Sequence, residues 1–84
     1  MGELQEVGKV LHFFGNINVA IIEVTETISI GDKISIKGPT TNIEQTITSM
    51  EIEHTKVGQA TPGQSVGMKV QDCVKENDTV YKTD

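Results

Sequence analysis

The stretch Gly31-Asp32-Lys33-Ile34-Ser35-Ile36-Lys37-Gly38 combines a tight turn with a short strand that alternates apolar and polar residues and ends at a second glycine. Glycine favours the turn because it adopts positive φ angles, and the aspartate after it can hydrogen-bond to nearby backbone. The alternation predicts that Ile34 and Ile36 face a core. The same turn-then-strand pattern recurs at Pro62-Gly63-Gln64-Ser65-Val66-Gly67 and at Asn77-Asp78-Thr79-Val80-Tyr81.

Other segments of the chain also read as short strands separated by Gly, Asn and Pro turns. We expect them at 7–14, 19–24, 43–53, 54–60, 66–70 and 79–81. Within 43–53 the apolar positions change from odd to even numbers, so we expect a β-bulge or sharp bend near Ser49. The predicted fold is all-β, a small closed or nearly closed antiparallel β-barrel of six to eight strands with almost no helix. Its expected core consists of Val10, Ala20, Ile22, Val24, Ile34, Ile36, Ile47, Met50, Ile52, Val66, Met68 and Val70.

Length and composition predict a single domain. The 84 residues fit one unit, with a flexible N-terminus over 1–6 and the β-barrel over 7–82. The single cysteine, Cys73, excludes an intramolecular disulfide and favours a cytoplasmic location. We expect no signal peptide and no contact with a membrane, because no apolar run approaches the roughly 20 residues that span a bilayer.

The charge balance disfavours nucleic acid as an autonomous ligand. The chain has a formal net charge of −5 and contains no arginine. Binding to phosphates requires a positive surface, and arginine is the best bidentate phosphate ligand. We therefore expect weak or no RNA binding by the isolated chain, with any contact made locally by four lysines: Lys33, Lys37, Lys56 and Lys69.

The inventory of catalytic residues is small. His12, His54 and Cys73 have no neighbouring base or ligand in a spacing typical of a nucleophilic or zinc site. A zinc site formed by Glu51, Glu53 and His54 is the less favoured alternative. Gly31-Asp32 lacks the pattern of a phosphate-binding loop. We expect no enzymatic activity and no cofactor or metal.

Five segments in order resemble the β-barrel domain that follows the GTPase domain in elongation factor Tu, and they cover about residues 7–82. These segments are 19–24, 30–38, 47–52, 60–70 and 77–81. The chain resembles the short stand-alone proteins called translation elongation factor-like, and it also resembles the barrel appended to collagenase-like peptidases. The GTPase domain of the translation factors is absent, which excludes GTP hydrolysis. Their Gly-Arg-Gly-Thr turn beside the aminoacyl-tRNA end corresponds here to Gly15-Asn16-Ile17-Asn18, which has no arginine.

The resemblance implies a non-catalytic translation-factor-like module that binds a protein or ribonucleoprotein partner. The alternative is an adaptor barrel for a partner enzyme such as a collagenase-like peptidase or an RNA-modifying enzyme. The oligomeric state stays open. Loops on a rigid scaffold often carry binding residues, so we expect the partner to contact two turns. The residues of this predicted partner face are Gly15, Asn16, Asn18, Lys37, Thr40, Thr41 and Asn42.

Overall fold

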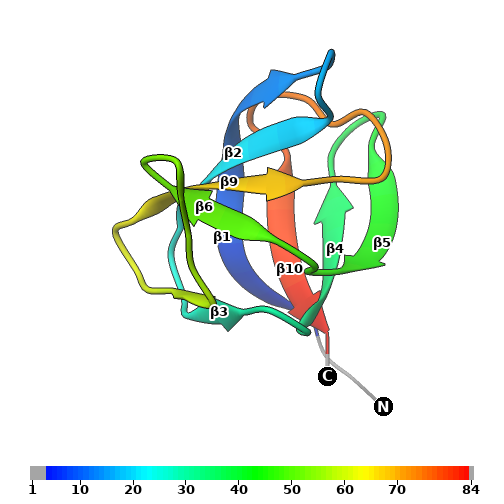
Figure 1. Cartoon of the computed structure of the whole chain (residues 1–84). Coiled ribbons are helices and arrows are strands. Elements are labelled where there is room, and N and C mark those ends of the chain that lie inside the picture. The colour runs from blue at the N-terminus through cyan, green and yellow to red at the C-terminus, as the bar shows by residue number, and fades with distance from the viewer. Residues whose placement is uncertain (1–3, 84) are drawn as a thin grey trace.

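The protein is all-β, as predicted. The computed structural model describes residues 4–83, and within them it contains strands and turns but no helix. Figure 1 shows how the strands wrap around a common interior. The strands are β1 (Gln5–Phe14), β2 (Val19–Val24), β3 (Ile28–Ser29), β4 (Lys33–Lys37), β5 (Asn42–Thr46), β6 (Met50–Ile52), β7 (Thr55–Lys56), β8 (Gln59–Ala60), β9 (Ser65–Lys69) and β10 (Thr79–Thr83).

Eight of these strands form one curved antiparallel sheet in the order β5-β4-β10-β1-β2-β9-β6-β7, and β3 pairs with β8 separately. The antiparallel pairing confirms the prediction, but the closed barrel is not confirmed, because no ladder joins the edge strands β5 and β7. β1 begins at Gln5, so the strand includes two residues that the sequence assigned to the flexible N-terminus. The first three residues of that predicted segment lie outside the described residues.

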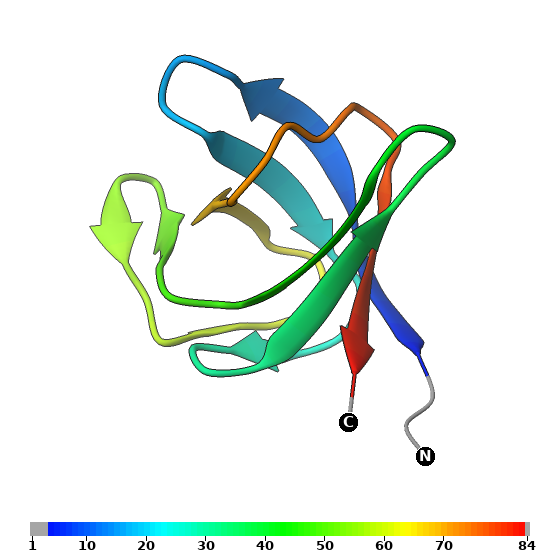
Figure 2. The same ribbon diagram turned by 90° about the vertical axis from the view of Figure 1, so that its right-hand side faces the viewer.

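The two ends of the sheet are nevertheless connected by a short piece of chain. Only Ile47–Ser49 separates β5, at one edge, from β6, near the other, and Figure 2 shows the chain sweeping between them. This interruption is the bend predicted near Ser49. A side chain also crosses the gap, since the amide of Gln45 donates a hydrogen bond to Lys69 O (2.9 Å) and accepts one from Gln71 N (2.8 Å). We call this gap between β5 and the end of β9 the seam.

The three turn-then-strand segments share one turn geometry over residues 29–32, 61–64 and 75–78. The third residue of each turn has a positive φ: 95° at Gly31, 92° at Gly63 and 74° at Asn77. Positive φ at this position is typical of a type II turn.

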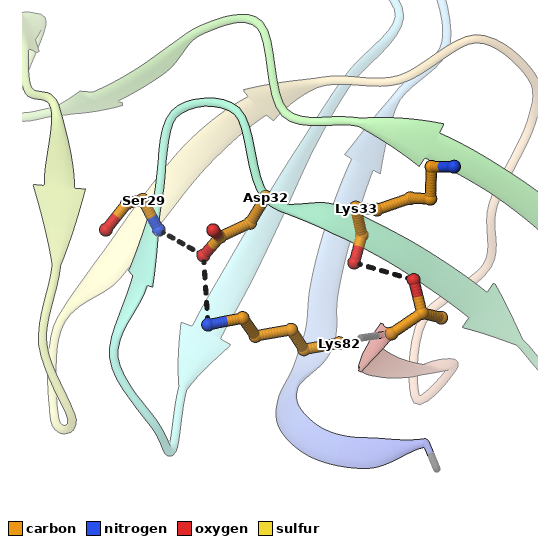
Figure 3. Close-up of polar contacts among 5 residues, drawn as sticks. Ser29, Asp32, Lys33 and Lys82 are labelled. Carbon is orange, nitrogen blue, oxygen red and sulfur yellow. Dashed lines mark hydrogen bonds and ion pairs between the residues drawn. The ribbon is translucent and has the colours of Figure 1, made fainter. Parts of the chain in front are cut away.

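In all three turns, the side chain of the fourth residue accepts a hydrogen bond from the first backbone N–H. The acceptor belongs to Asp32, Gln64 or Asp78, at distances of 2.9, 2.9 and 2.8 Å. Figure 3 shows the first case, in which Asp32 also forms an ion pair with Lys82 at 3.5 Å. The backbone carbonyl of the next residue, Lys33, accepts a hydrogen bond from Thr83 Oγ1 at 3.3 Å. The sequence motifs therefore form turns that are stabilised by a side-chain hydrogen bond, and they do not form phosphate-binding loops.

The core agrees closely with the sequence prediction. Every expected core residue is buried except Ile52, which is partly buried and packs against the core. The prediction missed further buried apolar residues: Val7, Ile28, Ala60, Val74 and Val80. Two of these, Ile28 and Ala60, are paired in the small β3–β8 sheet, which brings an apolar pair into the core.

β1 departs from simple alternation. Its register shifts between Glu6 and Gly8 against β10, and between Val10 and His12 against β2. Each β-bulge changes which side of the strand faces the core. Val7 and Val10 are therefore both buried, although their spacing in an unbroken strand would place them on opposite faces. No helix among the described residues is long and apolar enough to cross a membrane.

Candidate functional site

The predicted partner face is divided in the structure. The turn between β1 and β2 contains Gly15, Asn16 and Asn18. Thr40 and Thr41 lie in the turn between β4 and β5, and Lys37 and Asn42 are the strand residues that flank it. Figures 1 and 2 place both turns at the same end of the molecule, with the connection from β9 to β10 running between them. No hydrogen bond described within residues 4–83 joins the two turns directly. Asn18, at a φ of 55°, instead accepts a backbone hydrogen bond from Val70 N at 2.9 Å.

In the turn between β4 and β5, some residues that the sequence assigned to partner binding instead stabilise the turn. Lys37, Thr40 and Asn42 are exposed, but Thr41 is only 6% exposed. Gly38 N donates to the carbonyl oxygen of Thr41 at 2.8 Å, which closes the turn. A Cβ added at Gly38 would lie 2.0 Å from Oδ1 of Asp78, so this glycine is needed for close packing. Thr41 therefore has little surface to offer a partner.

A different surface feature is an open groove of about 310 Å³ on the outer face of β2, β9 and β6. These three strands run side by side in Figure 1. Two large apolar side chains beside the groove are open to solvent, Ile17 at 55% and Phe14 at 42% exposure. The apolar wall of the groove consists of Phe14, Ile17, Val19 and Ile21, and the polar wall consists of Glu51, Glu53 and His54.

Gly67 lies between the two walls. It pairs with Ile21 on β2 and with Glu51 on β6, so the three residues form one row across the sheet. A Cβ built at Gly67 would make only ordinary contacts, 3.5 Å to Ile21 and 3.5 Å to Val19. The packing does not require glycine here, and glycine weakens the interior of a strand. Its effect is to leave the middle of the groove open.

The polar wall contains a turn in an unusual conformation. Glu53 and His54 form the two-residue connection between β6 and β7, with φ angles of 50° and 65°. Positive φ at both positions defines a type I′ hairpin turn, which strongly prefers Asn-Gly. Glutamate is therefore poorly suited to this backbone, whereas histidine adopts positive φ more readily but fits less well than glycine. In the described part of the chain, neither Glu51 nor Glu53 is paired with a cation.

The other residues with chemical potential are scattered. His12 is exposed, and its Nδ1 lies 3.0 Å from Oε2 of Glu76. Its ring also packs edge-on against Phe14, with a distance of 4.5 Å between ring centroids. Cys73 is a free, exposed thiol. Within residues 4–83, no group of three or more metal-binding side chains is close enough to hold an ion.

The four lysines considered for RNA contact are exposed on three different strands. Lys33 and Lys37 lie on β4, Lys56 lies on β7 and Lys69 lies on β9. Lys56 is the cross-strand partner of Glu51, so an opposite charge lies near it. The fold therefore distributes these lysines over the sheet instead of collecting them on one strand.

The groove was not predicted from the sequence, although two residues of the predicted partner face lie beside it. These are Asn16 and Asn18, which flank Ile17 in the same turn. The available signal was the apolar character of Val19 and Ile21, which alternate with the inward-facing residues of β2 and therefore point outward. Opposite them, Gly67 interrupts an otherwise regular strand.

Comparisons with known proteins point to peptidases. No protein-family model matches the chain. The chain is 42% identical over 77 residues to an uncharacterized protease of Methanocaldococcus jannaschii, and the match covers 90% of this chain and 19% of that protein. It is 36% identical over 80 residues to a collagenase of Porphyromonas gingivalis, a match that covers 93% of this chain and 22% of the collagenase. The chain thus spans about a fifth of the length of the curated relatives it matches.

A solved structure has the same fold. The C-terminal domain of a proposed U32 peptidase of Geobacillus thermoleovorans superposes with a TM-score of 0.88 at 23% identity. This match covers 93% of the present chain and 91% of that domain. The predicted resemblance to the barrel of collagenase-like peptidases is confirmed, since the chain is similar in sequence to a region of these peptidases and shares the fold of a U32 peptidase C-terminal domain.

The main functional prediction was wrong. The sequence motifs indicated a translation-factor-like module, whereas the sequence relatives are a protease and a collagenase. The motifs misled because they encode turns and strand starts, which specify a fold that different functions can share. The alternative prediction, an adaptor for a collagenase-like peptidase, agrees better with these relatives.

Proposed function

We propose that this chain is a non-catalytic accessory domain of a collagenase-like peptidase of the U32 type. The observation that carries the proposal is the 42% identity over 77 residues to a region of a protease, together with the shared fold of a U32 peptidase C-terminal domain. The chain corresponds to about a fifth of such a protein, so the catalytic machinery is assigned to the remaining part.

A non-catalytic role agrees with the placement of the reactive side chains. His12 is hydrogen-bonded to Glu76, Cys73 is exposed, and His54 lies in the turn between β6 and β7. A nucleophile needs a base within hydrogen-bond reach and a third group that orients the base. The hydrogen bonds described for residues 4–83 contain no such set. We assign the domain to the cytoplasm, where Cys73 would remain a thiol.

A rigid scaffold suits this role, and we infer that the curved sheet behaves as a nearly closed barrel. Residues Ile47–Ser49 connect its two ends, and Gln45 bonds across the seam. Of the predicted partner face, the turn over 15–18 is the part that we retain as a contact surface, because it carries Ile17 into the groove. Free RNA is not part of the proposal, in keeping with the net charge of −5.

The proposal is tested by exchanging domains in the Porphyromonas gingivalis collagenase. Its 80 matched residues are either deleted or replaced by this chain, and cleavage of soluble collagen is measured for the native, deleted and exchanged enzymes. We expect the deletion to impair cleavage, the exchange to restore it, and the isolated chain to cleave nothing. Thermal unfolding of each protein identifies variants that fail only because they do not fold.

Two results would contradict the proposal. In the first, the folded exchanged enzyme is no more active than the deleted one, including when the purified chain is added separately. In the second, the isolated chain hydrolyses collagen by itself.

A further inference from the structure

The groove on β2, β9 and β6 contains three features that the stability of the fold does not explain. Large apolar side chains are exposed at Phe14 and Ile17. Gly67 occupies a strand position where a larger residue would fit. Glu53 and His54 occupy a turn that favours Asn-Gly. Local choices that cost stability are expected at functional sites, so their convergence on one surface indicates that the groove binds something.

From these features we infer that the groove is the docking site for an extended segment of the peptidase's catalytic part, with an apolar side chain next to a lysine or arginine. This inference rests on the proposed function and adds the contact surface and the chemistry of its occupant. The apolar side chain would lie over Gly67, against Ile21 and Val19. The basic side chain would face Glu51 and Glu53.

Charge decides between this occupant and a second copy of the chain. Glu51 and Glu53 border the groove and form no ion pair among the described residues, and each chain carries a net charge of −5. Two copies meeting through this face would bring like charges together as the apolar side chains became buried, which is unfavourable. A basic segment would instead add a positive charge beside Glu53 and Glu51, of which Glu51 also has Lys56 as its cross-strand neighbour. Most of each curated relative lies outside the region matched by this chain, so the remaining protein is long enough to supply the segment.

The absence of a side chain at Gly67 is suited to close approach by another backbone. Glycine within a strand often marks a place where a ligand or a second chain comes near the sheet. Here the neighbouring side chains of Ile21 and Val19 stand on one side of Gly67, and the carbonyl oxygen of Glu51 lies on the other. Filling this position should block docking with little effect on the fold, which makes Gly67→Val the decisive variant.

A matched control is available at Gly58. A Cβ at this residue meets nothing within 4 Å, its φ is not positive, and it does not line the groove. Gly58→Val therefore adds the same side chain at an exposed position elsewhere. Ile30 provides a matched spectroscopic control, because it is 42% exposed but lies outside the groove.

The experiment uses the full purified chain with isotope-labelled isoleucine methyl groups. Short overlapping peptides covering the Methanocaldococcus jannaschii protease outside its matched residues form one set of probes, and gelatin peptides form the second. We expect peptides from the protease that carry an apolar residue beside lysine or arginine to shift the methyl signals of Ile17 and Ile21 but not of Ile30. Gly67→Val should weaken binding by about tenfold or more, and Gly58→Val should leave it unchanged.

Each other outcome counts against the inference. It is contradicted if no peptide from the protease binds, if only gelatin peptides bind, or if a bound peptide leaves the methyl signals of Ile17 and Ile21 unshifted. The same holds if Gly67→Val and Gly58→Val have equal effects, or if Ile17 and Ile21 shift with protein concentration without peptide, which would indicate a second copy.

Introducing Gly67→Val into the exchanged collagenase separates this inference from the proposed function. An exchanged enzyme that works equally well with and without Gly67→Val retains the accessory role and rejects the groove. An exchanged enzyme that folds but never regains activity rejects the accessory role itself.

Discussion

The side-chain amide of Gln45 on β5 donates a hydrogen bond to the backbone carbonyl of Lys69 on β9 at 2.9 Å. It also accepts one from Gln71 N, so a single buried side chain spans the seam where the backbone ladder is open. We expect Gln45→Ala to lower the free energy of unfolding by about 1–3 kcal/mol, because two hydrogen bonds are lost in a partly buried place. Urea unfolding measures this change. Gln59→Ala, at an exposed glutamine, is the control, and an equal effect of both variants would show that Gln45 has no special role.

Close packing at Gly38 predicts a similar loss of stability from the addition of a single methyl group. Gly38→Ala would place a methyl group 2.0 Å from Oδ1 of Asp78, a buried carboxylate whose other oxygen accepts the hydrogen bond from Lys75 N. Because Asp78 is short and held in place, we expect a loss of about 1–3 kcal/mol from overpacking. The comparison is Gly58→Ala, which meets nothing within 4 Å. Equal unfolding midpoints for the two variants would contradict the prediction.

The two interactions of Asp32 can be separated by substitution. Asp32→Asn keeps an oxygen to accept the hydrogen bond from Ser29 N but removes the ion pair with Lys82, which is partly exposed (Figure 3). We expect a loss of about 0–1 kcal/mol for Asp32→Asn, typical of a surface ion pair. Asp32→Ala removes both contacts and should cost about 1 kcal/mol more. Both variants lack the ion pair, so added salt should not change the difference between their free energies of unfolding. If salt removes that difference, the hydrogen bond from Ser29 N is not its cause.

Gly67→Val should be tolerated by the isolated domain. The substitution adds a β-branched residue to a strand and makes no close contact through its Cβ, so we expect stability to stay the same or to rise by up to about 1 kcal/mol. Thermal unfolding and the methyl spectrum of the core report this directly. A large loss of stability would mean that the groove lacks the space that its geometry indicates.

Replacing the turn residues Glu53 and His54 should increase stability and weaken docking. Glu53→Asn with His54→Gly creates the pair that best fits positive φ at both positions, and a gain of about 1–2 kcal/mol is expected from relief of backbone strain. The same change removes an acidic side chain from the groove wall and should reduce peptide affinity. Single substitutions distinguish the two effects, since His54→Gly leaves Glu53 in place. A more stable double variant with undiminished affinity would exclude the turn from the binding site.

The sequence was sufficient for the class of fold because its signals were local. The turns over 29–32, 61–64 and 75–78 contain their own positive-φ residue and their own acceptor side chain, so each can be recognised without knowledge of the rest. The change of parity between Ile47 and Met50 likewise revealed the bend. β1 gave no such signal, because apolar residues occur on both of its faces and its two bulges depend on how β10 and β2 pair with it.

The groove could not be predicted for a related reason. Ile21, Gly67 and Glu51 are distant in sequence and become one row only through the pairing of β2 with β9 and of β9 with β6. The prediction instead selected the two turns over 15–18 and 38–41, and in the second turn Gly38 is required for close packing against Asp78. Gly67, in the middle of a strand, was more informative about a surface, since there the fold does not require a glycine.

The pairing of Gln5 with Lys82 places the ends of β1 and β10 side by side at one end of an antiparallel pair. A mechanical load applied at these two positions acts along the inter-strand hydrogen bonds, so the bonds would break one after another instead of resisting together. Within a larger protein under tension, the domain would therefore unzip at low force. Opening would begin at Gln5, at the end of β1 opposite Phe14, so the groove would be among the last features of the sheet to be lost.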